Sequence, residues 1–219
     1  MVREFEELLS LDKTICADLF SEVKYPWEIF DRLSEYIVEL GKSLPSDKYD
    51  YYEGDIWVAK SAKVAGSVAI CGPCIICDNA EIRHCAYIRG SVIIGRGCVL
   101  GNSCEVKSSV LFESACVPHF NYVGNSILGF CAHLGAGAIT SNLKSDGSLV
   151  TIRLESEIKT GLRKLGAIIG DKAEIGCGAV LNPGSIIGKG AMVYPLSSVR
   201  GFVPSNSIYK ESGKIVRRV

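Results

Sequence analysis

The chain has 219 residues, of which 47% are hydrophobic, and this is enough to bury the core of one domain with an appendage. Its 24 Lys and Arg balance its 24 Asp and Glu, so it lacks the overall positive charge that binding to nucleic acid or an anionic membrane usually requires. No stretch reaches the roughly 18 apolar residues of a membrane span. We expect a soluble cytoplasmic protein with neither a nucleic acid nor a membrane as partner.

Residues 1–50 carry helical patterns. In YPWEIFDRLSEYIVELGKSL the apolar residues recur at helical spacing on one side, namely Trp27, Phe30, Leu33, Ile37 and Leu40. We expect this N-terminal segment to be helical and to pack on the rest of the chain or to cap it.

Residues 51–204 are dominated by a six-residue repeat. Apolar residues stand at every sixth position from Val58 to Phe112, and the same spacing returns from Ile169 to Val199. This pattern is typical of a left-handed parallel β-helix, in which each hexad supplies a short strand and a corner, and three hexads close a triangular coil of about 18 residues. We therefore predict a mainly β protein, with residues 205–219 as a C-terminal tail.

The residue four places after each apolar position must be small, because it turns into a tight corner. Four cysteines fall in this column: Cys74, Cys98, Cys104 and Cys116. Free cysteines often behave as small buried apolar residues.

The stretch CGPCIIC, residues 71–77, has the spacing of a metal or redox site. In the repeat, Cys74 points inward, whereas Cys71 and Cys77 fall on successive outer faces. The three thiols do not converge, and we predict no metal or redox site here.

Residues 18 apart stack on the same face of neighbouring coils. Arg89 and Lys107 have this spacing, and both occupy an outward position. Two stacked cations make an anion such as a phosphate a natural partner, although they can also be solvated surface residues bridged by Glu105.

The repeat is disturbed after Phe112, in a stretch that contains His119, Tyr122, His133 and Asn142. Irregularities in a regular repeat re-aim side chains and often lie near functional sites. His119 has a side chain suited to accepting a proton from an amine or hydroxyl near neutral pH. A loop-prone excursion follows, over residues 142–164.

The segment GNSCEVKSSVLFESACVPHFNYVGNSILGFCAHLGAGAITSN resembles the acetyltransferase half of the bacterial bifunctional N-acetylglucosamine-1-phosphate uridyltransferase/glucosamine-1-phosphate acetyltransferase. The specific features are Arg89, PHFNY, LGAGAIT and Asn142 at matching spacings, and the similarity covers roughly residues 56–212. The resemblance implies a homotrimer of left-handed β-helices with active sites between subunits. It also implies an acetyl-CoA-dependent N-acetyltransferase that acts on an amino-sugar phosphate in UDP-N-acetylglucosamine biosynthesis, with no metal required for acetyl transfer.

The resemblance also implies roles for individual residues. His119 is the expected general base, and Ala136 offers a backbone N–H to the developing oxyanion. The expected contacts of the sugar phosphate are Arg89, Glu105, Lys107, Tyr122, His133 and Asn142. The expected contacts of coenzyme A are Ala136, Lys164, Cys177, Pro195 and Lys210.

Several positions depart from the family pattern. His133 stands where the family has an Asn, Leu143 replaces a Tyr, Cys177 replaces a Ser, and the excursion after Asn142 is longer. The uridyltransferase half has no counterpart in this chain.

Two other functions remain open from the sequence. One is a non-catalytic trimer that binds a sugar phosphate or nucleotide sugar, or that works with a separate nucleotidyltransferase. The other is a zinc-dependent hydratase, but His84, His119 and His133 lack the paired spacing of a three-histidine zinc site.

Overall fold

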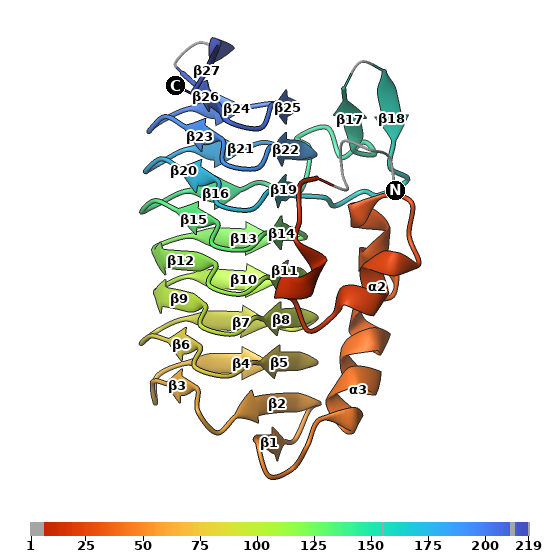
Figure 1. The fold of residues 1–219 in the computed structure, drawn as a ribbon, viewed down its shortest axis with the longest axis vertical. Coiled ribbons are helices and arrows are strands. Elements are labelled where there is room, and N and C mark those ends of the chain that lie inside the picture. Colours follow the sequence, from red (N-terminus) through yellow and green to blue (C-terminus); the bar gives the residue numbers. More distant parts are fainter. Residues whose placement is uncertain (1–6, 155, 211–212, 219) are drawn as a thin grey trace.

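The main body of the chain is a triangular parallel β-helix, shown in Figure 1. The computed structural model describes residues 7–154, 156–210 and 213–218. Successive strands visit three sheets in turn, here called sheets A, B and C. The predicted left-handed β-helix of hexapeptide repeats is therefore confirmed.

Sheets A and B each have nine strands. Sheet A comprises β1 (Tyr49–Tyr52), β2 (Ile56–Ala59), β5 (Cys74–Ile76), β8 (Val92–Ile94), β11 (Ser109–Leu111), β14 (Ile127–Leu128), β19 (Ala167–Ile169), β22 (Ser185–Ile187) and β25 (Phe202–Val203). Sheet B comprises β3 (Lys63–Val64), β6 (Glu81–Ile82), β9 (Val99–Asn102), β12 (Cys116–His119), β15 (His133–Leu134), β20 (Glu174–Ile175), β23 (Met192–Val193), β26 (Ser207–Tyr209) and β27 (Ile215–Arg217).

Sheet C has seven strands. They are β4 (Ala69–Cys71), β7 (Tyr87–Arg89), β10 (Glu105–Lys107), β13 (Tyr122–Gly124), β16 (Ile139–Thr140), β21 (Val180–Leu181) and β24 (Ser198–Val199). Within these three sheets the described strands pair in parallel, except that the terminal strands β1 and β27 pair antiparallel to their neighbours. Strand β26 continues the β-helix beyond residue 204, where the apolar spacing of the sequence ends.

The interior of the prism is filled by the apolar residues of the repeat. Ile76, Ile88, Leu100 and Val106 are fully buried in one cluster that runs the length of the helix. The small column behaves as expected at Cys74, Cys98 and Cys104, which face the same cluster. Burial of thiols and aliphatic side chains together keeps the interior close-packed.

The predicted register is wrong after Lys107. Ser109 and Ser126 stack at a step of 17 residues, whereas earlier coils step by 18. Two residues with positive φ, Gly90 and Ser91, form the corner of one coil, but Ser108 alone forms it in the next. The shorter corner shifts the phase by one residue.

This shift changes which side chains face the interior. Leu111 takes the inward position expected for Phe112, and Phe112 instead meets Phe20 edge to face with ring centroids 5.5 Å apart. Cys116 and Val110 leave the small inward column for the same reason, and Cys116 lies half-buried beside His133 on sheet B.

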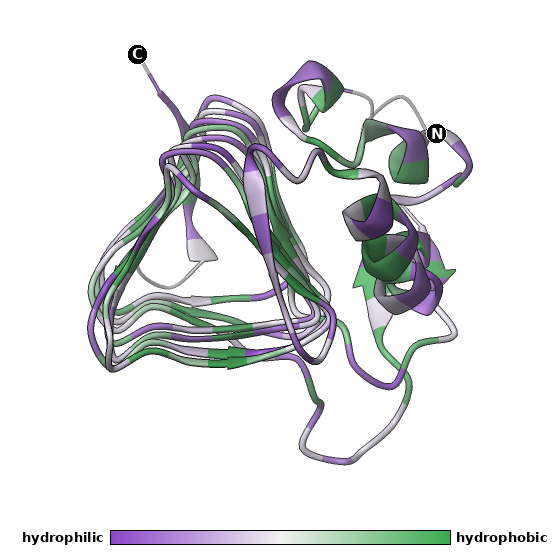
Figure 2. Ribbon diagram, turned by 90° about the horizontal axis from the view of Figure 1, so that it is seen from below, coloured by the Kyte–Doolittle hydropathy of each residue, from purple (hydrophilic) through white to green (hydrophobic). Residues whose placement is uncertain are grey.

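The N-terminal segment covers the outer surface of sheet A, as the end-on view in Figure 2 shows. Its helical elements are η1 (Leu11–Lys13), α2 (Ala17–Ser21), η2 (Pro26–Asp31) and α3 (Leu33–Ser43), where η marks a 3₁₀ helix. Sheet A is apolar on both sides, because Ile75, Ile93 and Ile127 point outward between inward residues. Trp27, Leu33 and Ile37 bury this outer surface, which explains why the helices pack on sheet A. None of the described helices is long and apolar enough to cross a membrane.

The excursion over residues 142–164 is more ordered than the expected loop. It contains an antiparallel hairpin of β17 (Thr151–Arg153) and β18 (Glu157–Lys159). Val150, Ile152 and Leu165 are fully buried and join the apolar cluster outside sheet A. The base of the excursion closes through a bridge between Leu143 and Lys164.

Gly41 in α3 provides a test of helix docking. A Cβ at this position would overlap the indole ring of Trp57. We expect Gly41→Ala to lower the free energy of unfolding by about 1–3 kcal/mol, as overpacking typically does, although Ala is intrinsically the better helix former by about 1 kcal/mol. Urea unfolding measures this change, and Ser34→Ala on the exposed side of α3 is the control. A stabilised Gly41→Ala protein would contradict the tight approach.

Candidate active site

Polar side chains converge on the outer surface of sheet C. The register that pairs Val106 with Ile88 places Lys107 beside Arg89. Glu105, on the same strand as Lys107, accepts a hydrogen bond of 2.6 Å from Arg89 Nη1. Lys164, an expected contact of coenzyme A, lies near Lys107 at the base of the excursion, close enough to lower the pKa of the Lys107 ammonium. We call Arg89, Lys107 and Lys164 the cation cluster.

The cation cluster carries an excess of positive charge. The pKa of the Lys107 ammonium is lowered, first by burial and then by repulsion from Lys164 and Arg89, while Glu105 opposes this only in part. A lowered lysine pKa means that the charged form is disfavoured where it stands. A bound anion would relieve that repulsion, so the cluster has the electrostatics of an anion site.

Tyr122 and Asn142 border the cation cluster. Tyr122 begins β13, and the pKa of its hydroxyl is raised by burial and by Glu105, while Arg89 and a hydrogen bond with Asn142 act against the rise. Asn142 Nδ2 also donates to Asn125 Oδ1 at 2.7 Å. These contacts hold a phenol and an amide, both able to bind hydroxyl groups, next to the cations.

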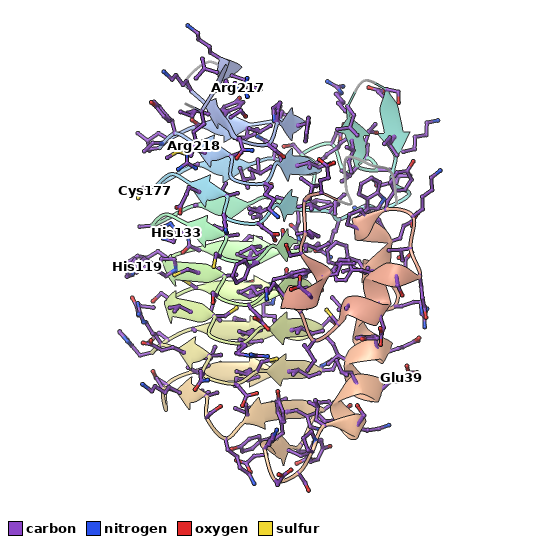
Figure 3. All side chains as sticks on the ribbon, in the orientation of Figure 1. Glu39, His119, His133, Cys177, Arg217 and Arg218 are labelled. Carbon is purple, nitrogen blue, oxygen red and sulfur yellow. The ribbon has the colours of Figure 1, made fainter. Side chains whose placement is uncertain are left out.

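His119 ends β12 at the corner between sheets B and C. Cys116 pairs with His133, His133 pairs with Glu174, and Glu174 pairs with Met192, which fixes the register from β12 to β23. In this register the residues stacked in successive coils are His119, Ala136, Cys177 and Pro195, which we call the corner column. Figure 3 shows His119, His133 and Cys177 along the same edge of the β-helix.

The corner is held by a buried side chain that sequence reasoning missed. Asn121 is only 3% exposed, and its Oδ1 accepts the backbone N–H of His119 at 3.0 Å. Its Nδ2 donates to the carbonyls of Gly135 and Ala138 at 2.8 and 3.0 Å. Cys104, Asn121 and Ala138 follow one another at steps of 17 residues. With this shorter step, the small inward column that contains Cys104 continues to Asn121, and this is how the sequence could have identified Asn121 as an inward residue.

The corner column has exposed and unsatisfied groups. The His119 side chain is exposed and forms no hydrogen bond with any residue in the described ranges. The backbone N–H of Ala136 likewise has no acceptor among the described residues, whereas its carbonyl accepts the N–H of Gly178 at 2.8 Å. An imidazole and a free N–H on adjacent coils are the two groups that acyl transfer to an amine requires.

Two further predicted residues lie beside the corner column. His133 Nδ1 is 2.8 Å from Glu174 Oε2 on the next coil, a partner that sequence reasoning did not identify. Lys210 Nζ lies 5.6 Å from the ring centre of Tyr194, next to Pro195. Lys210 thus marks the C-terminal end of the column.

One chain does not bring the two groups of residues together. His119 lies before sheet C, at the corner with sheet B, whereas Arg89 and Lys107 end strands of sheet C at the opposite corner. Tyr122 leans away from His119, since its hydroxyl and Asn142 crowd the space next to Gly124. His119 and the cation cluster therefore lie at opposite ends of the sheet C strands in a single β-helix.

The cysteines of CGPCIIC point in different directions. Cys71 is exposed, Cys74 is buried in the prism, and Cys77 is buried under the helices outside sheet A. No group of three or more metal-binding side chains is found within the part of the chain that the structure describes.

Thiol labelling tests this arrangement. Burial raises the pKa of Cys16 and Cys77 to about 12 and also raises the pKa of Cys74 and Cys98. In native protein near pH 8 we expect fast reaction only at the three exposed cysteines, Cys71, Cys85 and Cys177, and reaction at all ten in denaturant. Peptide mass mapping after a short pulse identifies the sites. Fast labelling of Cys74 or Cys77 would contradict the burial.

Comparison with known proteins gives matches in the same region. The family described as GMPPB C-terminal domain matches residues 70–162. The bifunctional protein GlmU of Methanococcus maripaludis strain C5 is 32% identical over 115 residues, which are 52% of this chain and 28% of that protein. A bifunctional sugar-1-phosphate nucleotidylyltransferase/acetyltransferase of Sulfurisphaera tokodaii is 36% identical over 107 residues, 48% of this chain and 27% of that protein. The chain thus spans less than a third of the length of these relatives.

Solved structures of lower identity also match. The acetyltransferase domain of PglB from Neisseria gonorrhoeae in complex with acetyl coenzyme A is 14% identical, with a TM-score of 0.29, over 83% of this chain and 62% of that one. PerB of Caulobacter crescentus with CoA and GDP-perosamine is 19% identical, with a TM-score of 0.34, over 74% and 56%. Similarity at this level gives no information on function. The sequence matches nevertheless confirm the predicted resemblance: about half of this chain is similar in sequence to bifunctional proteins of the GlmU type.

Proposed function

We propose that the protein transfers an acetyl group from acetyl-CoA to the amine of an amino-sugar phosphate, of which glucosamine-1-phosphate is the simplest candidate. The observation that carries this proposal is the corner column, in which His119 stands on the coil next to the free N–H of Ala136. The names of the curated relatives, which include an acetyltransferase activity, support it.

The cation cluster would bind the acceptor phosphate. Arg89, Lys107 and Lys164 would offer three cations to the phosphate oxygens, and binding would relieve the repulsion that lowers the pKa of Lys107. Glu105, Tyr122 and Asn142 would contact the sugar hydroxyls. Lys164 thereby moves from the expected coenzyme A contacts to the acceptor side.

The corner column would bind the thioester. Ala136, Cys177 and Pro195 present small side chains along one edge, and Lys210 at the end of that edge would meet a coenzyme A phosphate. His119 would accept the proton of the acceptor amine as its nitrogen attacks the thioester carbonyl, and the N–H of Ala136 would stabilise the oxyanion. Collapse breaks the C–S bond, and the proton passes from His119 to the leaving thiolate.

A second copy of the chain would complete the site. Because His119 and the cation cluster lie at opposite ends of the sheet C strands in one β-helix, the corner column of one subunit would approach sheet C of its neighbour, as in a trimer. Sheet A is covered by the N-terminal helices, which leaves sheets B and C for this contact. A sugar acetylated in this way would feed nucleotide-sugar synthesis, such as that of UDP-N-acetylglucosamine.

Acetyl transfer is tested by incubating the purified protein with acetyl-CoA and glucosamine-1-phosphate or other amino-sugar phosphates. Product is detected by mass, because ten cysteines interfere with thiol-release assays. Lys107→Met is expected to raise KM for the acceptor about tenfold or more, by loss of a charge-assisted contact, while Lys42→Met on the exposed side of α3 serves as the matched control. No acetylated product, from a protein that still binds the acceptor, would favour a binding or scaffold role beside a separate nucleotidyltransferase.

A further inference from the structure

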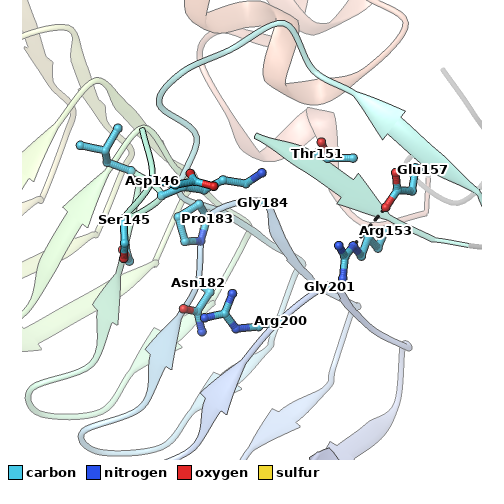
Figure 4. Close-up of a pocket in the computed structure, with 13 residues that line it drawn as sticks. Ser145, Asp146, Thr151, Arg153, Glu157, Asn182, Pro183, Gly184, Arg200 and Gly201 are labelled. Atoms are coloured by element: carbon cyan, nitrogen blue, oxygen red, sulfur yellow. Dashed lines mark ion pairs between the residues drawn. The ribbon is translucent and has the colours of Figure 1, made fainter. Parts of the chain in front are cut away.

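A polar cavity, separate from the candidate active site, lies between the excursion and the coils that follow it. It measures about 540 Å³, a size that suits a small metabolite. Asn182 and Arg200 line its wall on the β-helix, and Lys144, Asp146, Thr151 and Arg153 line the wall on the excursion. Figure 4 shows the two walls facing each other across the hollow. None of the three residues of the cation cluster lines this cavity.

Both walls are fixed by packing and hydrogen bonds. The hairpin rests against the corner at Gly184, where a Cβ would come within 2.8 Å of Val150 Cγ1, and Val150 itself is fully buried. Asn182 Nδ2 donates to Val199 O at 2.8 Å and to Ser198 Oγ at 3.0 Å, which leaves its Oδ1 without a partner among the described residues. The cavity is therefore preformed.

The turn that closes the excursion wall is ordered as well. Asp146 Oδ1 accepts the backbone N–H and the hydroxyl of Ser148 at 2.9 and 2.8 Å, and these hydrogen bonds lower the pKa of Asp146. Lys144 Nζ donates to the carbonyl of Leu149 at 2.8 Å. The Lys144 ammonium also donates to the hydroxyl of Ser148 at 3.4 Å, so neutral acceptors hold it in place, and the Asp146 carboxylate is near enough to interact with its charge.

The cavity has more positive than negative charge. Arg200 forms no ion pair with any residue that the structure describes, and Lys144 donates hydrogen bonds only to neutral groups among them. Arg153 Nε is balanced by Glu157 Oε1 at 3.3 Å. The Arg200 guanidinium, which has no ion-pair partner among the described residues, favours an anion, and its fork fits phosphate oxygens.

The remaining lining groups suit a ligand whose phosphate is attached to a molecule with several hydroxyl groups. Thr151, Ser141 and Ser145 bring hydroxyls to the cavity, and none of these hydroxyls is hydrogen-bonded to a described residue. The carboxylates of Asp146 and Glu157 can accept hydrogen bonds from ligand hydroxyls but would repel a ligand that is anionic throughout. A phosphate at one end and hydroxyls at the other match this distribution.

We infer that this cavity is a second ligand site, for the phosphate ester of a hydroxylated molecule, with Arg200 and Lys144 as its phosphate ligands. The carrier is a sugar or a nucleoside. Ser141 lines the cavity, and its neighbour Asn142 contacts Tyr122 beside the cation cluster, so the two sites share one short backbone segment. The inference does not depend on acetyl transfer, because it concerns binding at residues outside the proposed active site.

Calorimetric titration of the full chain with three probes tests the inference. The probes are inorganic phosphate, glucose-1-phosphate and uridine 5′-monophosphate. Each is titrated into the native protein and into Arg200→Gln, Lys144→Gln, Lys107→Met and Arg96→Gln. Arg96 is an exposed arginine away from both sites and is the matched control. Thermal unfolding of each variant confirms that it is folded.

We expect at least one phosphate ester to bind with an affinity that falls about tenfold or more in Arg200→Gln and in Lys144→Gln, but not in Lys107→Met or Arg96→Gln. The preferred ester distinguishes a sugar from a nucleoside carrier. If no probe shows binding that depends on Arg200, or if all binding disappears in Lys107→Met, the second site is ruled out. Acetyl transfer is also measured on Arg200→Gln. This measurement distinguishes the absence of a second ligand site from the absence of acetyl transfer.

Discussion

Replacement of His119 by alanine is expected to lower the rate of acetyl transfer about 100-fold or more, which is the usual effect of losing a general base. Acceptor binding should persist, because the cation cluster lies at the other end of sheet C. The measurement is kcat and KM for acetylated product by mass detection, together with acceptor affinity by calorimetry. The expected pattern is a fall in kcat with little change in affinity.

The corner itself provides the matched control for His119. His84 precedes it in the same stack, since Asn102 pairs with His119 and its Nδ2 donates to the carbonyl of His84 at 3.1 Å. His84→Ala removes an equally exposed imidazole two coils earlier and is expected to leave the rate unchanged. A His119→Ala protein that retains its rate within a few-fold would show that another group takes the proton.

Replacement of Asp171 by alanine is expected to lower the free energy of unfolding by about 3–5 kcal/mol, the usual range for breaking a buried charged network. Asp171 is fully buried and ties the N-terminal segment to the β-helix. Its Oδ2 accepts the backbone N–H and hydroxyl of Ser10 at 3.0 and 2.6 Å, and its Oδ1 accepts the N–H of Phe130 at 2.8 Å. Alanine would leave these partly buried donors without acceptors.

Urea unfolding followed by tryptophan fluorescence measures the effect, because Trp27 and Trp57 are buried where the N-terminal segment meets sheet A. Lys189→Met separates the ion pair from the hydrogen bonds. Lys189 Nζ lies 3.3 Å from Asp171 Oδ2 but is half exposed, so its loss should cost only about 1 kcal/mol or less. A loss below about 1 kcal/mol in Asp171→Ala would mean that the carboxylate is not the anchor of the segment.

The residues of the cation cluster differ in how far the sequence predicts their positions. The adjacency of Arg89 and Lys107 follows from the 18 residues of one regular coil, and the pairing of β10 with β7 has this step. Lys164 also lies near Lys107, and the hexad spacing does not predict that contact. Residues 142–164 separate Lys164 from the regular coils, and the spacing of a repeat carries no information across an insertion.

The sequence by itself determined the coil and its interior. Each hexad places one aliphatic side chain inward, because successive side chains of a strand alternate between its two sides, and this local rule needs no knowledge of distant contacts. The tertiary structure alone decided the rest. The corner at Ser108 is one residue shorter, which turned Phe112 outward onto Phe20. The hairpin stands against Gly184 and encloses a cavity. Corner length and hairpin docking depend on hydrogen bonds and packing between segments far apart in the chain, which no local spacing records.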